Sequence, residues 1–152
     1  MYRTLARSLR LLTYGNSYFN LSGGPTIEGM EVNLATNQYL PVDDTDIPLG
    51  TIDKWPGIQA DAPFTLGTQE PDIDHCFIID TDARQVPVDT RSRPLSRLVT
   101  LSHPITGLHL EISSTEPAFQ FYLGRHINVP SSEHGPERAA RSGLCVEPSR
   151  CK

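Results

Sequence analysis

The 152-residue sequence predicts an all-β protein built as an antiparallel β-sandwich. Two observations favour this class. Apolar residues occur in short runs, and 13 prolines and 11 glycines are scattered between these runs. In addition, no long segment keeps the 3.6-residue period of an amphipathic helix. The length suits one hydrophobic core, so we expect a single domain over residues 1–152.

Four strands are expected in the first half of the chain. They are short runs rich in apolar and β-branched residues, covering residues 32–35, 38–42, 64–66 and 76–80. The segments between them carry turn residues, as in SGGPTIEG and DDTDIPLG at residues 22–29 and 43–50. Loops of this kind on a sandwich usually form the binding site.

A hairpin is expected next. Leucine and isoleucine alternate with polar residues over residues 108–113, which predicts a strand with one buried face. The turn-like segment HPITG at residues 103–107 joins it to a strand over residues 97–102.

The next expected strand has two chemically different faces. Phe119 and Phe121 fall on one face, whereas Gln120 and Tyr122 fall on the other. The phenylalanines are expected in the core, so Gln120 is expected to point away from it.

The last expected strand raises a question about charge. Residues 144–146 form a short apolar run that ends at Glu147, followed by a proline. Glu147 either points into solvent, or it lies at the mouth of a cleft and moves protons. This strand lies near the last residue with little to cover it, and the chain begins abruptly. We therefore expect an incomplete sandwich.

Composition excludes several classes of partner. The net charge of −5 lacks the basic surface that nucleic acid or an anionic membrane requires. Cys76, Cys145 and Cys151 show no zinc or redox spacing, so we expect buried, reduced thiols. The histidines are scattered, and no metal site is expected.

The first fifteen residues allow two interpretations. Arg3, Arg7 and Arg10 without any acid give the composition of a mitochondrial targeting segment. Alternatively, residues 8–13 form a strand. The reduced thiols favour the cytoplasm, with the mitochondrion as the alternative location.

Five motifs occur in register along the chain. They are SYFNLSG at 17–23, YLPVDDTDIPLG at 39–50, PDIDHCF at 71–77, SSTEPAFQFYLG at 113–124 and SGLCVEPSR at 142–150. Together they resemble the C-terminal half of the aldose 1-epimerase (galactose mutarotase) family, most closely the mutarotase portion of fungal galactose-pathway enzymes. The resemblance covers residues 12–150. It implies a galactose mutarotase-like β-sandwich that interconverts the α and β anomers of a free hexose, such as galactose or glucose, without a cofactor.

The resemblance also implies roles for individual residues. The family's base falls on Glu147, and its sugar-binding positions fall on Asp74 and Gln120. A carboxylate and a histidine carry out the reaction, one removing the anomeric proton while the other protonates the ring oxygen. His75 does not match a catalytic position and is expected to be structural.

One position departs from the family pattern. Asn16 stands where the family places its acid histidine, and an amide donates a hydrogen bond but cannot release its proton. The family also takes a histidine and an arginine from an N-terminal half without counterpart here. The chain is therefore expected to be an aldose 1-epimerase with impaired activity; the alternatives are a sugar-binding pseudoenzyme or a truncated remnant. Whether another chain completes the sheet stays open.

Overall fold

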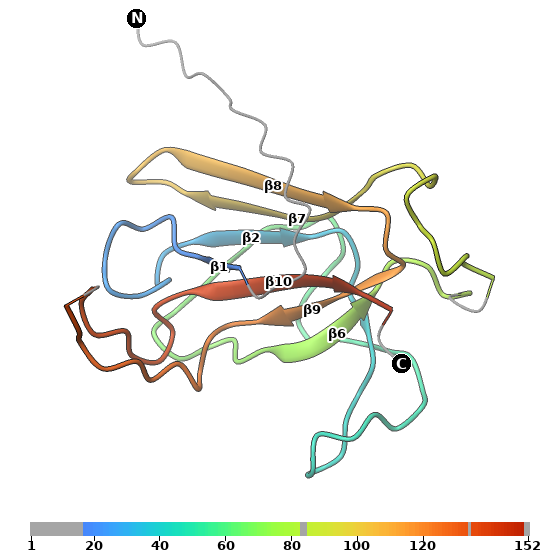
Figure 1. Cartoon of the computed structure of the whole chain (residues 1–152), viewed down its shortest axis with the longest axis horizontal. Coiled ribbons are helices and arrows are strands. Elements are labelled where there is room, and N and C mark those ends of the chain that lie inside the picture. Colours follow the sequence, from blue (N-terminus) through green and yellow to red (C-terminus); the bar gives the residue numbers. More distant parts are fainter. Residues whose placement is uncertain (1–16, 83–84, 134, 151–152) are drawn as a thin grey trace, which may run out of the picture.

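The computed structural model describes residues 17–82, 85–133 and 135–150, which form ten strands in two antiparallel sheets. The two sheets face one another as a sandwich (Figure 1). The predicted all-β antiparallel class is confirmed. Across these described ranges, nothing has the length and apolar character of a membrane-spanning helix.

The larger sheet contains six strands. Their order is β1 (Tyr18–Phe19), β10 (Leu144–Ser149), β9 (Ala118–Tyr122), β6 (Asp74–Ile78), β3 (Gln38–Tyr39) and β4 (Asp53–Lys54). Strand β9 pairs along its whole length with β10 on one side and with β6 on the other. These three strands form the middle of the sheet.

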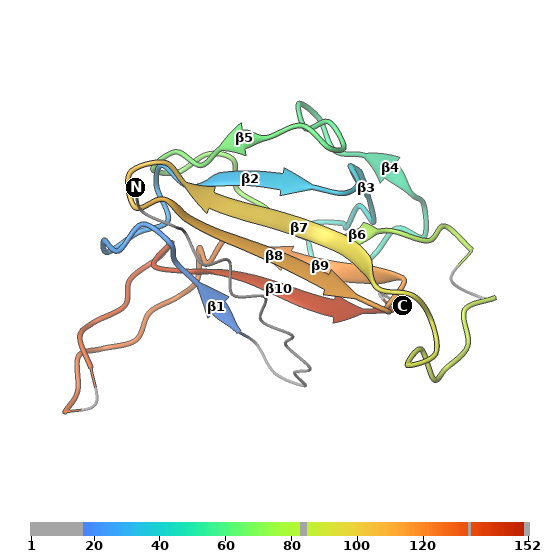
Figure 2. The ribbon, with the colours of Figure 1, turned by 90° about the horizontal axis from the view of Figure 1, so that it is seen from above.

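The smaller sheet contains four strands. Their order is β5 (Phe64–Thr65), β2 (Glu31–Leu34), β7 (Ser96–His103) and β8 (Leu108–Ser114). The predicted hairpin is confirmed as β7 and β8, which pair with a register shift between Arg97 and Val99. Seen from above, β7 and β8 cross over β9 and β10 (Figure 2).

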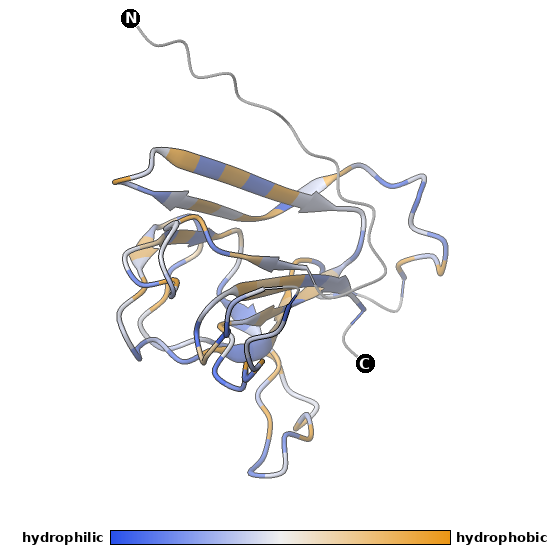
Figure 3. Ribbon diagram, turned by 60° about the vertical axis from the view of Figure 1, so that its left-hand side comes forward, coloured by the Kyte–Doolittle hydropathy of each residue, from blue (hydrophilic) through white to orange (hydrophobic). Residues whose placement is uncertain are grey.

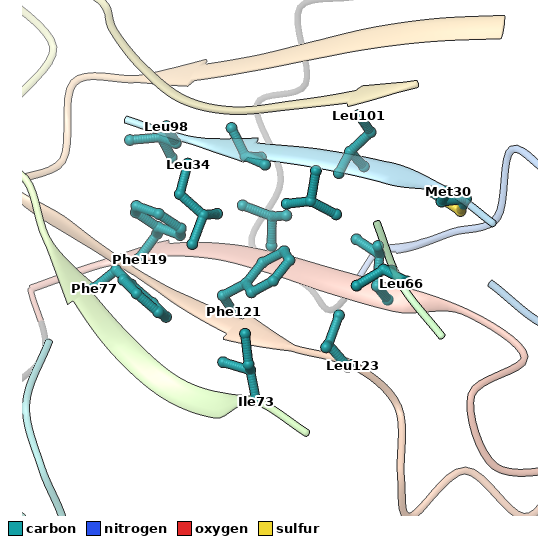
Figure 4. Packing of buried hydrophobic residues seen from close by; sticks show 14 of the residues in the cluster. Met30, Leu34, Leu66, Ile73, Phe77, Leu98, Leu101, Phe119, Phe121 and Leu123 are labelled. Atoms are coloured by element: carbon teal, nitrogen blue, oxygen red, sulfur yellow. The ribbon is translucent and has the colours of Figure 1, made fainter. Parts of the chain in front are cut away.

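The core lies between the two sheets. Phe77, Phe119 and Phe121 of the larger sheet are fully buried and point toward leucines of the smaller sheet (Figure 4). The rings of Phe77 and Phe119 stack with centroids 5.8 Å apart, and Phe121 meets Phe77 edge-on at 6.3 Å. Such pairs add to the stabilisation from apolar burial. The predicted inward direction of Phe119 and Phe121 is confirmed.

One expectation about strands was wrong, and two short strands were missed. The alternation along β8 (Figure 3) predicts three inward apolar residues, but Leu108 is 53% exposed because β8 lies at the edge of its sheet. Leu110 and Ile112 do pack against the core. The short strands β1 and β4 were not predicted, since two residues carry no detectable period.

Strand β10 also differs from its prediction. It extends to Ser149 and lies between β1 and β9, so the expectation of a poorly covered strand was wrong. Glu147 therefore lies within a strand. Among the described residues β1 pairs only with Leu144 and Cys145, so the part of β10 that contains Pro148 pairs only with β9. Proline is tolerated where one side of a strand needs no ladder donor.

The cysteines behave differently from one another. Cys145 is a buried free thiol, as predicted, whereas Cys76 is disulfide-bonded, so the prediction was wrong for Cys76. Cys151 and the first sixteen residues, including Asn16 and the segment 8–13, lie outside the described residues.

Replacing Phe121 by alanine is expected to lower the free energy of unfolding by about 3–5 kcal/mol, because a large ring is lost from a close-packed core. Urea denaturation measures the change. Leu108→Ala on the exposed edge is the control, with an expected change within about 0.5 kcal/mol. Equal losses in the two variants would contradict this assignment of the core.

Candidate sugar-binding face

The outer face of the larger sheet carries the polar residues of its three middle strands. Gln120 on β9 lies directly opposite Cys76 on β6 and Glu147 on β10. One row further along, Tyr122 lies opposite Asp74 and Cys145. Because side chains alternate along a strand, these residues share the face opposite the core phenylalanines.

The three site residues named from the sequence are brought together on this face. Gln120 Nε2 donates a hydrogen bond of 2.7 Å to Asp74 Oδ1. Glu147 is the cross-strand neighbour of Gln120, and side chains in that relation have Cβ atoms about 4.5–5.5 Å apart. All three side chains are half-buried. Asn16 is the one named residue whose position is not described.

A cavity of about 380 Å³ opens beside Asp74 and Gln120. The loop side chains Val42, Asp46 and Pro48 also line it. Its volume lies in the range of roughly 300–1,000 Å³ found for small-molecule sites. Strand β10 contributes Ser149 to the lining, whereas Glu147 does not line the cavity.

The loop over residues 40–50 is held in place by local hydrogen bonds. Asp43 Oδ1 accepts from the hydroxyl of Thr45 at 2.7 Å and from the backbone N–H groups of Thr45 and Ile47 at 2.8 and 3.0 Å. The hydrogen bond from the Thr45 hydroxyl is the main reason that the pKa of Asp43 lies below its ordinary value. The loop expected to build the site thus forms an ordered wall.

A charged group lies at the entry to β6. Arg125 Nη1 donates to Asp72 Oδ2 at 3.0 Å, and this hydrogen bond raises the pKa of Arg125. The negative charges of Asp74 and Asp46 act in the same direction. No local sequence pattern indicates a role for Arg125, because its partner Asp72 is 53 residues away in the chain.

His75 lies among aromatic rings. Its ring centroid is 4.8 Å from that of Trp55 and 5.3 Å from that of Tyr39. Burial lowers the pKa of His75, and the nearby charge of Asp74 opposes this shift. A neutral, packed histidine is suited to a structural role.

Tyr122 is a further side chain on the polar face. Its hydroxyl oxygen accepts a 2.6 Å hydrogen bond from the backbone N–H of His126, and its ring meets Tyr18 edge-on at 6.5 Å. The alternation that predicts the direction of Gln120 also predicts that of Tyr122. The described residues contain no group of three or more acidic, histidine or cysteine side chains able to hold a metal.

Comparisons with known proteins identify relatives. The sequence profile of a family described as aldose 1-epimerase matches residues 15–152. The chain is 34% identical over 139 residues to the bifunctional protein GAL10 of Kluyveromyces lactis, covering 89% of this chain and 19% of that protein. It is 34% identical over 142 residues to the galactose mutarotase of Mus musculus, covering 87% of this chain and 39% of that protein.

A solved structure shares the fold. The crystal structure of a GalM/aldose epimerase homologue from C. elegans superposes with a TM-score of 0.68 at 19% identity, covering 88% of this chain and 40% of that chain. This chain thus spans well under half the length of the proteins that it matches.

Cys145 is expected to resist alkylation in the folded protein. Burial, followed by the charge and hydrogen bonding of Glu147, raises its pKa from 9.0 to about 12. At pH 8 a thiol with this raised pKa has roughly a thousandth of the thiolate fraction of a thiol with a pKa of 9.0. Iodoacetamide labelling with peptide mapping measures the rate, and the urea-unfolded chain is the control. Equal labelling rates would show that the thiol is exposed.

Proposed function

The chain belongs to the aldose 1-epimerase family, and from this membership we propose that its polar sheet face binds a free hexose such as galactose or glucose. The observation that carries the proposal is the 2.7 Å hydrogen bond between Gln120 and Asp74, with Glu147 opposite Gln120 on the same face. The cavity of about 380 Å³ lined by Asp74 and Gln120 offers room for a sugar ring.

The hydrogen-bonding capacity of this pair suits a polyhydroxylated ligand. The Asp74 carboxylate accepts from hydroxyl donors, and one of its oxygens accepts the hydrogen bond from Gln120. The Gln120 amide keeps a carbonyl oxygen and a second N–H for the ligand. The contact between the two side chains fixes both before the sugar arrives, which lowers the entropic cost of binding.

Glu147 is proposed as the base of anomer interconversion. Its carboxylate removes the proton from the anomeric hydroxyl, the bond between C1 and the ring oxygen breaks, and the ring oxygen takes up a proton from solvent water, because the Asn16 amide cannot release one. Rotation of the resulting aldehyde and reclosure on its other face then produce the second anomer. In the reclosure step Glu147 returns its proton to the aldehyde oxygen, and the hydroxyl that re-forms the ring gives its proton back to water.

The asparagine at position 16 favours a second candidate, a sugar-binding protein with little or no catalysis. An amide in place of the acid can donate a hydrogen bond to the ring oxygen but cannot transfer a proton. Loss of a general acid typically costs about 100- to 10,000-fold in rate. The two candidates share the binding face and differ only in proton transfer.

Polarimetry of freshly dissolved α-D-galactose tests the first candidate. The unmodified chain is expected to speed the change in rotation above the buffer rate, and Glu147→Gln is expected to abolish that increase, because the amide accepts no proton. Circular dichroism spectra of both proteins control for folding. Retained acceleration in Glu147→Gln would rule out Glu147 as the base.

Restoring the acid separates the two candidates. Asn16→His is expected to raise kcat by about 100- to 10,000-fold, whereas Asn16→Ala is expected to give no increase. Saturable galactose binding with no acceleration in the unmodified chain or in Asn16→His would support the non-catalytic candidate. It would also exclude a missing acid as the sole defect.

A further inference from the structure

Arg141 is a buried arginine beside the start of β10. It is only 7% exposed, and within the described part of the chain its guanidinium donates hydrogen bonds to backbone carbonyls. Nη1 donates to the carbonyl oxygens of Gln69 at 3.1 Å and Pro71 at 3.0 Å, and Nη2 donates to that of Gly67 at 3.0 Å. One side chain therefore satisfies three carbonyls of a single loop.

This arrangement is costly, which indicates that the guanidinium has a specific role. The backbone of Arg141 has a φ of 60°, in the left-handed region that a non-glycine residue rarely adopts. A buried positive charge is also unfavourable, and burial is the main cause of the lowered pKa of Arg141. A glycine would relieve the backbone strain but would leave the loop carbonyls without these donors.

The loop that Arg141 holds leads directly into the sugar site. Residues 67–71 precede Asp72 and Ile73, and Asp74 follows as the first residue of β6. The backbone of Arg141 is anchored as well, since its N–H donates to the carbonyl of Gly124 at 2.8 Å, just after β9. Arg141 thus links the start of β6, the end of β9 and the approach to β10.

We propose that Arg141 is a positioning residue, whose contact with the 67–71 loop sets the location of the Asp74 carboxylate relative to Gln120 and Glu147. The part of this proposal that concerns sugar affinity rests on the proposed function. The part that concerns the contact between Asp74 and Gln120 does not, because that contact exists in the ligand-free protein.

Lysine cannot replace Arg141 in this role. The planar guanidinium presents donors from two nitrogens in a fixed fork, and here the fork reaches carbonyls spread over residues 67–71. A single ammonium group at the end of a flexible chain cannot reach all three with the same geometry. The start of β6 should then shift, and Asp74 with it.

Arg93 offers a matched control, because its guanidinium contacts residues next to the same two strands, β6 and β9. Its Nη1 donates to the carbonyl of Thr115 at 2.8 Å, and its Nη2 contacts Asp80 Oδ2 at 3.0 Å. Thr115 precedes β9 and Asp80 follows β6, so Arg93 joins these strands at the end opposite to Arg141. Arg93→Lys removes a similar contact away from Asp74.

The experiment follows the side-chain amide resonance of Gln120 by NMR in the ligand-free protein. The Asp74→Ala variant gives the chemical shift of this resonance when the hydrogen bond to Asp74 is absent. Arg141→Lys and the strain-relieving Arg141→Gly are expected to move this resonance toward the Asp74→Ala position. Arg93→Lys is expected to leave it in place. An unmoved resonance in a folded Arg141 variant, or an equal shift in Arg93→Lys, would overturn the proposal.

Galactose titration supplies the second readout at a temperature where all variants are folded. Both Arg141 variants are expected to raise the Kd for galactose at least about tenfold, since small displacements of binding groups have large effects on affinity. Arg93→Lys should bind as the parent does. Unchanged affinity in the Arg141 variants would overturn the sugar-site role. If the parent itself bound no galactose, the proposed function would fail, whereas the Gln120 resonance would still decide whether Arg141 positions Asp74.

Discussion

The pairing register of β9 between β6 and β10 is the constraint on which the site depends. Phe119 and Phe121 are fully buried, so Gln120 and Tyr122 must point to the opposite face. A slip of one residue would place phenylalanines in solvent and a glutamine in the core. Losing one such ring from the core costs about 3–5 kcal/mol, so burial of apolar surface holds the polar groups in place.

The same register brings together residues that are far apart in the sequence. Asp74, Gln120 and Glu147 come from three different strands, and only the antiparallel pairing makes them neighbours. Loop contacts then adjust their positions along the sheet, with Arg141 acting at one end of β6. Sugar binding and proton transfer require different groups at this site. In the proposed function the pair of Asp74 and Gln120 contacts sugar hydroxyl groups, whereas anomer interconversion also needs a proton donor for the ring oxygen.

Much of this arrangement could be predicted from the sequence, because period-2 alternation is a local property. This alternation predicted the face on which Gln120 lies and the hairpin of β7 and β8. The exposure of Leu108 could not be predicted, because it follows from the edge position of β8, which is a property of the whole sheet. The position of β10 between β1 and β9 and the contacts of Arg141 were missed for the same reason: their partners lie far away along the chain.

The most direct measurement of the central claim is a galactose titration followed by backbone and side-chain NMR of the folded chain. The account predicts that the largest shifts fall on Asp74, Gln120 and Glu147 and saturate together. The structure has a second cavity, of about 570 Å³, whose lining includes Tyr18 and Asn128. Shifts confined to that second cavity would contradict the account. The complete absence of shifts at saturating sugar would contradict it equally.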